Sequence, residues 1–126
     1  PVVANGIDYP GTRISDSLNK PGMEPPVYYW APSRNPSGMA FYRGNLFPQW
    51  RGSLFVSMLE GRFLDRLNIS KGKVVAEEPL LMELKSRIRD VAVGPDGAVY
   101  VLTDGGTPSM TVASAASSSL LKLTPK

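Results

Sequence analysis

The 126-residue sequence contains no cysteine and no histidine. Without cysteine, disulfide bonds and thiolate chemistry are excluded, and the redox compartment stays open. Without histidine, the chain lacks the most usual general base, the commonest metal ligand and any Ser-His or Cys-His nucleophile. An enzyme built from these residues alone would therefore need an Asp, Glu, Lys or Tyr as its base.

Long apolar runs are also absent, since none approaches the roughly 20 residues that a membrane-spanning helix needs. The opening PVVANGIDYPG has neither the basic start nor the apolar stretch of a signal peptide, and it does not begin with Met, so we expect a processed chain or a piece of a longer one. The net charge of +3 is spread along the chain without a basic, aromatic-rich stripe, so we expect no nucleic-acid partner. No calcium loop, phosphate loop or dinucleotide-binding glycine pattern is present.

Short apolar runs between turns fill the sequence from residue 38 onward, and they predict an all-β fold. Turns such as SKGK and GPDG join neighbouring runs closely, as antiparallel hairpins require. The Pro- and Gly-rich lead of 1–37 is typical of a functional loop or a linker, and the Ser/Ala-rich stretch 109–119 is expected to be a flexible hairpin loop. The expected strands are 38–42, 53–59, 62–69, 73–81, 88–93, 98–103 and 119–124.

The strand pattern repeats after about 50 residues, because PSGMAFY, GSLFVSML and RFLDRLNI are echoed by RDVAVGPDG, AVYVLTD and SLLKLTP. Such a period, with about four strands per unit, is typical of β-propeller blades. We therefore expect a propeller fragment of roughly two four-stranded antiparallel blades: a loop segment carrying pocket aromatics at 1–37, one blade at 38–84 and a last, incomplete blade at 85–126. An isolated fragment would expose sheet edges, so self-association is expected.

Arg87 and Arg89 stand one residue apart at the head of an expected hairpin, KSRIRDVAVGPDGAVYVLTDGG. On a regular strand both side chains leave from the same face. Guanidinium groups match carboxylates, so the pair is interpreted either as an anion clamp or as exposed residues lying over apolar neighbours. Asp104, at the far end of the partner strand, would pair with one arginine, or is an ordinary turn residue.

The densest aromatic cluster of the chain is VYYW, at 27–30. In an extended segment Tyr28 and Trp30 point to one side and form a stacking wall for a planar ring or a sugar face, or they fill a gap in the core. Ser33 would supply a small polar contact nearby. Trp50, by contrast, is expected to be structural. The neighbours Glu77 and Glu78 would face opposite ways on a strand and form a poor carboxylate pair.

The string PVYYWAPSRNPSGMAFYRGNLFPQWRGSLFVSMLEGRFLDRL, followed by RIRDVAVGPDGAVYVLTD and LLKLTP, resembles the soluble quinoprotein sugar dehydrogenases. This is the glucose/sorbosone dehydrogenase family, and in particular its aldose sugar dehydrogenase branch. The resemblance implies a six-bladed β-propeller, periplasmic or secreted, that holds pyrroloquinoline quinone (PQQ) with calcium over its axis. It also implies oxidation of an aldose at C1 by hydride transfer to the quinone. The chain would be the C-terminal part of such an enzyme, with the remaining blades of its parent chain as partners.

The resemblance also implies roles for individual residues. Arg87 and Arg89 match arginines that bind the carboxylates of PQQ, and Asp104 matches an aspartate near them. Trp30, Ser33 and either Tyr28 or Tyr29 fall in the segment that lines the cofactor or substrate pocket.

Three departures separate this sequence from the family pattern. PSRNPSG replaces the usual PSIAPSG, which puts Arg34 and Asn35 near the pocket. Leu59 and Glu60 stand where some relatives use a lysine for PQQ. The catalytic histidine and the calcium ligands of the family belong to earlier blades, so we expect this chain alone to be inactive. The alternatives are a non-catalytic propeller that binds a sugar or a protein partner, and a free-standing β-domain that pairs across chains.

Overall fold

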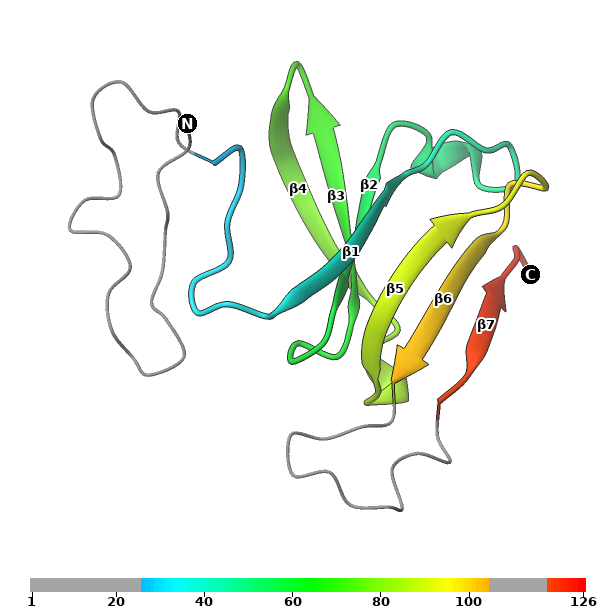
Figure 1. Ribbon diagram of the computed structural model, residues 1–126. Coiled ribbons are helices and arrows are strands. Elements are labelled where there is room, and N and C mark those ends of the chain that lie inside the picture. Colours follow the sequence, from blue (N-terminus) through cyan, green and yellow to red (C-terminus); the bar gives the residue numbers. More distant parts are fainter. Residues whose placement is uncertain (1–25, 105–117) are drawn as a thin grey trace.

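The computed structural model describes residues 26–104 and 118–126, which form two antiparallel β-sheets (Figure 1). The first sheet has the order β1-β2-β3-β4, with strands Pro36–Phe41, Leu54–Met58, Leu64–Ser70 and Lys73–Leu80. The second has the order β5-β6-β7, with strands Arg87–Val93, Val99–Asp104 and Leu120–Leu123. Two short 3₁₀ turns, η1 (Pro48–Trp50) and η2 (Met82–Leu84), lie between β1 and β2 and between β4 and β5.

The seven expected strands are confirmed, each with its ends within two residues of the expected ones. Two of the turns between them use glycine where the backbone is left-handed, at Gly72 (φ 76°) and Gly97 (φ 83°), which suits a residue without a β-carbon. Most of the expected loop at 109–119 lies outside the described residues. The division of the chain at 38–84 and 85–126 stays a prediction.

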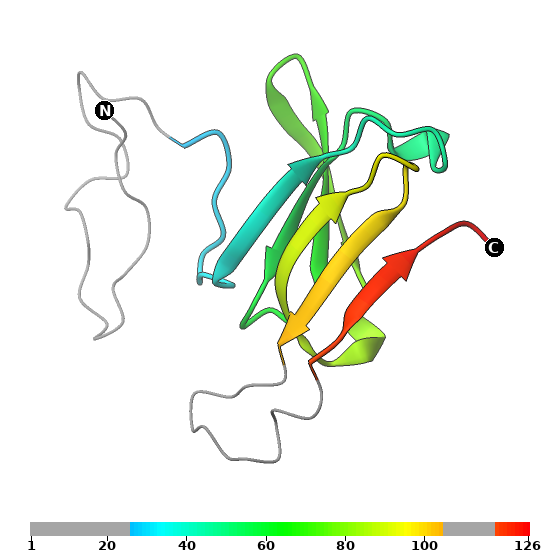
Figure 2. The same cartoon turned by 45° about the vertical axis from the view of Figure 1, so that its right-hand side comes forward.

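The two sheets pack against each other through β1, β2 and β5, which lie side by side in both views (Figures 1 and 2). At the centre of this core, the Tyr42 hydroxyl donates to the Gly97 carbonyl at 2.7 Å and accepts from the Phe47 N–H at 2.9 Å. Trp50 stacks on Phe47 with ring centroids 4.2 Å apart, so its expected structural role is confirmed. The buried members of this core are Tyr42, Phe47, Phe55, Leu64, Ile88, Val91, Val99 and Val101.

A polar bridge joins the sheets where β1 approaches the start of β5. The Ser37 hydroxyl lies 2.8 Å from the Ile88 carbonyl and 2.8 Å from the Ser57 hydroxyl. Next to it, a β-carbon added to Gly38 would lie only 2.3 Å from Oδ1 of Asp90. Glycine at this position therefore lets β1 and β5 come together.

The face of the first sheet that points away from the second sheet carries a smaller apolar cluster. Its buried members are Val56, Met58, Phe63 and Leu67, and Tyr28 and Trp30 pack on them from the segment before β1. Among the described residues, no helix has the length and apolar character needed to cross a membrane.

Candidate functional site

A cavity of about 450 Å³ lies where the loop before β1, the β2–β3 turn and the start of β5 meet. Three arginines and a single acid contribute to its walls, so its lining carries excess positive charge. Ser33 and Arg87, two of the residues singled out from the sequence, meet in this cavity. The lining residues are Pro32, Ser33, Arg34, Leu59, Glu60, Arg62 and Arg87.

Backbone hydrogen bonds attach the loop before β1 to the β2–β3 turn. The Gly61 N–H donates to the Arg34 carbonyl at 3.1 Å, and the Leu59 N–H donates to the Asn35 carbonyl at 3.0 Å. The Ser33 hydroxyl accepts from the Asn35 N–H at 3.1 Å. These bonds place the loop beside the turn, so Arg34 on the loop and Leu59 and Glu60 at the turn all border the cavity.

Arg87 carries the clearest sign of a binding role. Its Nε is buried and has no hydrogen-bond partner. An unsatisfied buried donor costs about 1–3 kcal/mol, and more when it is charged. A carboxylate is the ligand whose geometry matches a guanidinium group. The guanidinium groups that line the cavity therefore fit a carboxylate-bearing ligand such as PQQ.

The side chain of Arg89 lies in different surroundings from that of Arg87, because β5 contains a β-bulge. The pairing of β5 with β6 shifts between Ile88 and Asp90, so Arg89 is the extra residue. Ile88 and Val91 can both enter the core although they are three positions apart, and the Arg89 side chain is 58% exposed. Its Nη1 lies 3.9 Å from Oδ2 of Asp104, which is the arginine–aspartate pair expected from the sequence. Arg89 is not part of the cavity wall.

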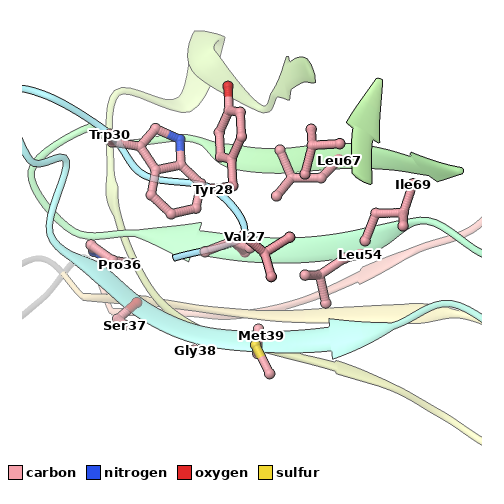
Figure 3. Close-up of a pocket in the computed structure, with 12 residues that line it drawn as sticks. Val27, Tyr28, Trp30, Pro36, Ser37, Gly38, Met39, Leu54, Leu67 and Ile69 are labelled. Atoms are coloured by element: carbon pink, nitrogen blue, oxygen red, sulfur yellow. The ribbon is translucent and has the colours of Figure 1, made fainter. Parts of the chain in front are cut away.

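Tyr28 and Trp30 line a separate groove of about 430 Å³ on the outer face of the first sheet, together with residues such as Leu54 and Leu67 (Figure 3). Their rings meet edge to face with centroids 5.2 Å apart. The structure therefore differs from the sequence expectation, which grouped these aromatics with Ser33 in one pocket. The difference arises because the polar atoms of both rings bond to acids on β3 and β4.

Of those acids, Asp65 was missed by the sequence interpretation, and Glu77 was considered only as a poor partner for Glu78. Asp65 is fully buried. The Trp30 indole N–H lies 3.0 Å from Oδ2 of Asp65 and 3.3 Å from Oε1 of Glu77, and the Tyr28 hydroxyl donates to Oε2 of Glu77. Glu78 instead pairs with Arg66 at 2.8 Å, so the prediction that adjacent glutamates face opposite ways is confirmed.

The surroundings of Tyr28, Asp65 and Glu77 shift the pKa values of these three groups in different directions. Burial, followed by hydrogen bonding to Glu77, raises the pKa of Asp65 to about 7. The hydrogen bond from Asp65 is the main cause that lowers the pKa of Glu77, and the hydrogen bond to Glu77 raises the pKa of Tyr28 to about 12. Between the ordinary glutamate pKa of 4.5 and about pH 7, the two acids therefore hold one proton between them. In the sequence, this cluster was marked only by Asp65, an aspartate next to Leu64. Its contact with Glu77 could not be recognised, because diagonal neighbours depend on the register of β3 and β4.

Chemically, the arginine cavity can bind an anion, whereas the groove is mainly apolar. Neither contains a metal centre: in 26–104 and 118–126 no three acids gather closely enough to hold a metal ion.

Comparison with known proteins gives consistent matches. The family model for glucose/sorbosone dehydrogenase matches residues 1–112. Aldose sugar dehydrogenase YliI from Escherichia coli (strain K12) is 41% identical over 106 residues, which are 82% of this chain and 29% of that protein. The crystal structure of a glucose dehydrogenase superposes with a TM-score of 0.79 at 42% identity, covering 96% of this chain and 33% of that one.

A more distant relative of known structure is described in complex with PQQ. The PQQ-bound form of an aldose sugar dehydrogenase from Streptomyces coelicolor superposes with a TM-score of 0.63 at 23% identity, over 83% of this chain and 29% of that one. At this identity the likeness shows the fold alone. The neighbours are β-propellers, so the two sheets are part of a propeller, as expected. The chain spans about a third or less of the length of the relatives it matches.

Proposed function

The chain belongs to the glucose/sorbosone dehydrogenase family, and from that premise we propose that it is the C-terminal part of a PQQ-dependent sugar dehydrogenase. The observation that carries the proposal is a cavity lined by Arg34, Arg62 and Arg87, the last of which has a buried Nε without a hydrogen-bond partner. PQQ is a tricarboxylate, and this part of the protein would anchor it.

Individual residues take the following roles in this proposal. Arg87 binds a cofactor carboxylate from the cavity wall, and Arg89 binds another from outside that wall. Asp104 orients the Arg89 guanidinium through the pair seen at 3.9 Å. Ser33 supplies a small polar contact in the cavity wall. Tyr28 and Trp30 line the neighbouring groove, so we assign them to packing on the first sheet instead of to cofactor contact.

Bound PQQ would accept a hydride from C1 of an aldose, which oxidises the sugar. The cationic arginines would stabilise the negative charge that reduction adds to the cofactor. Because the sequence has no histidine, we propose that the base for the C1 hydroxyl proton, like the calcium ligands, belongs to residues outside this chain. A periplasmic or secreted location and inactivity of the isolated segment are parts of the same proposal.

The test uses the intact protein that contains these residues, prepared without cofactor and titrated with PQQ in the presence of calcium. We expect Arg87→Ala together with Arg89→Ala to weaken PQQ binding at least 100-fold, because each charge-assisted hydrogen bond contributes roughly 1.5–3 kcal/mol. Arg51→Ala, an exposed arginine at the end of η1, is the control and should leave affinity unchanged. Dye reduction with a panel of aldoses should require PQQ.

Two results would contradict the proposal. Unchanged PQQ affinity in the double variant would remove the assignment of the arginines. A protein that neither retains PQQ nor turns over any aldose would instead be a non-catalytic propeller that binds a sugar or a protein partner.

A further inference from the structure

We propose that Arg34 and Arg62 are anion-binding residues of the arginine cavity and that, with Arg87, they hold one carboxylate-bearing ligand. The inference rests on the proposed function in taking that ligand to be PQQ. It adds two residues that the family resemblance does not assign to cofactor binding. The three arginines come from three separate segments: the loop before β1, the β2–β3 turn and the start of β5.

The first argument is charge. The cavity wall contains three guanidinium groups and the single carboxylate of Glu60. Among the described residues, none of the three arginines takes part in an ion pair; the pairs present are Arg66–Glu78, Arg89–Asp104 and Lys122–Asp96. Like charges around one cavity repel each other. An anionic ligand is the partner that would relieve this repulsion.

The second argument is the geometry of Arg62. Its backbone is left-handed, with φ 58°, a conformation that costs a residue with a β-carbon roughly 1–2 kcal/mol. Its Nη1 donates to the Lys85 carbonyl at 3.4 Å, two residues before Arg87. This bond links the exposed Arg62 side chain to the start of β5. Asn35 (φ 59°), next to Arg34, and Lys85 (φ 52°), two residues before Arg87, are also left-handed.

The third argument concerns Arg34, whose carbonyl accepts the Gly61 N–H at 3.1 Å. This bond fixes the backbone of Arg34 against the β2–β3 turn. Arg34 also interacts with an acid outside the cavity, because its positive charge helps to lower the pKa of Glu77. The largest contribution to that shift is the hydrogen bond from Asp65. Part of the Arg34 charge is therefore already balanced. We accordingly expect Arg62 to contribute more to ligand binding than Arg34.

The experiment measures binding and not turnover. The intact protein, freed of cofactor, is titrated by calorimetry with PQQ and, separately, with citrate as a tricarboxylate without redox chemistry. We expect Arg62→Gln to weaken PQQ binding about 10-fold, as the loss of one charged hydrogen bond should. Arg34→Gln should weaken it only about 3-fold, because Glu77 already balances part of the Arg34 charge. Arg62→Lys should fall between wild type and Arg62→Gln, because it keeps the charge but loses the planar fork. Arg51→Gln is the matched control, and equal thermal midpoints exclude unfolding as the cause.

The outcomes separate this inference from the proposed function. If Arg87→Gln weakens PQQ binding while Arg34→Gln and Arg62→Gln do not, the inference is overturned and the proposed function stands. If the wild type binds citrate but not PQQ, and Arg62→Gln weakens citrate binding, the anion site stands and the proposed function fails. A wild type that binds neither compound overturns both.

Discussion

A buried carboxyl group favours its neutral form, and Asp65 is held in this state by its surroundings. Its pKa of about 7 in the folded protein lies above the ordinary value of 3.8, so between these values the folded state binds more protons than the unfolded state. The stability that comes from Asp65 is therefore fully present below about pH 4 and is lost as the pH rises to about 7. Glu77, whose pKa is lowered, contributes stability that is lost as the pH falls below its ordinary value of 4.5.

We therefore predict that the stability of Asp65→Asn relative to wild type is greater at pH 8 than at pH 5. The amide keeps the neutral form and still has a hydrogen to donate, whereas the wild-type carboxyl must ionise in a buried site. The difference in unfolding free energy between variant and wild type should rise by about 2 kcal/mol between these pH values, since one pKa unit corresponds to about 1.4 kcal/mol. Urea unfolding of the intact protein measures it.

The control for this pH dependence is Glu83→Gln, because Glu83 is an exposed acid in η2. Its difference from wild type should be the same at both pH values. A constant difference for Asp65→Asn as well would show that Asp65 is already ionised in the folded protein.

At the scale of strands, the sequence was informative because turns and apolar runs are local signals. Glycine in the SKGK and GPDG turns and the apolar runs beside them predicted the β3–β4 and β5–β6 hairpins, with small errors at the strand ends. The meeting of Ser33 with Arg87 in one cavity was implied by the family resemblance and not by any local pattern.

Features that depend on register and on contacts between sheets could not be predicted. The bulge at Arg89 arises because Ile88 and Val91 must both face the core, which cannot be known before β5 is placed on β6. The pairing of Asp65 with Glu77 likewise requires the alignment of β3 with β4. A regular alternation would have put Arg87 and Arg89 in equivalent surroundings, which the bulge prevents.

The approach of β1 to β5 leads to a second prediction, for Gly38→Ala. A β-carbon at this position would lie 2.3 Å from Oδ1 of Asp90, an atom that accepts a hydrogen bond from the Val91 N–H at 2.9 Å. The Asp90 side chain can move only by losing that bond, so we expect a destabilisation of about 1–3 kcal/mol, typical of added volume in a tight contact. Chemical unfolding of the intact protein measures this value.

A double-mutant cycle supplies the control for Gly38→Ala. In an Asp90→Ala background the obstructing oxygen is absent, so the same substitution should cost at least 0.5 kcal/mol less, a coupling expected of residues in contact. If Gly38→Ala is equally destabilising in both backgrounds, its contact with Asp90 is not the cause of the destabilisation.

For the whole molecule, the important feature is apolar surface that the described residues leave uncovered. Met39 is 65% exposed beside the groove on the outer face of the first sheet, and Leu120 is 69% exposed on the edge strand β7. Apolar faces and sheet edges of this kind mediate association between chains. In a longer propeller we propose that neighbouring blades cover them.

The exposed apolar surface predicts that Met39→Lys benefits the isolated chain, by reducing association, but destabilises the intact protein. The isolated 126-residue chain should associate as its concentration rises, and Met39→Lys or Leu120→Lys should reduce its mean mass in light scattering. Met82→Lys, at a 57% exposed position in η2 away from the groove and the β7 edge, is the control and should have little effect. In the intact protein Met39→Lys should instead lower the thermal midpoint, because it buries a charge against the adjoining blade. A monomeric isolated chain at every concentration, together with an unchanged midpoint in the intact variant, would mean that no blade covers this face.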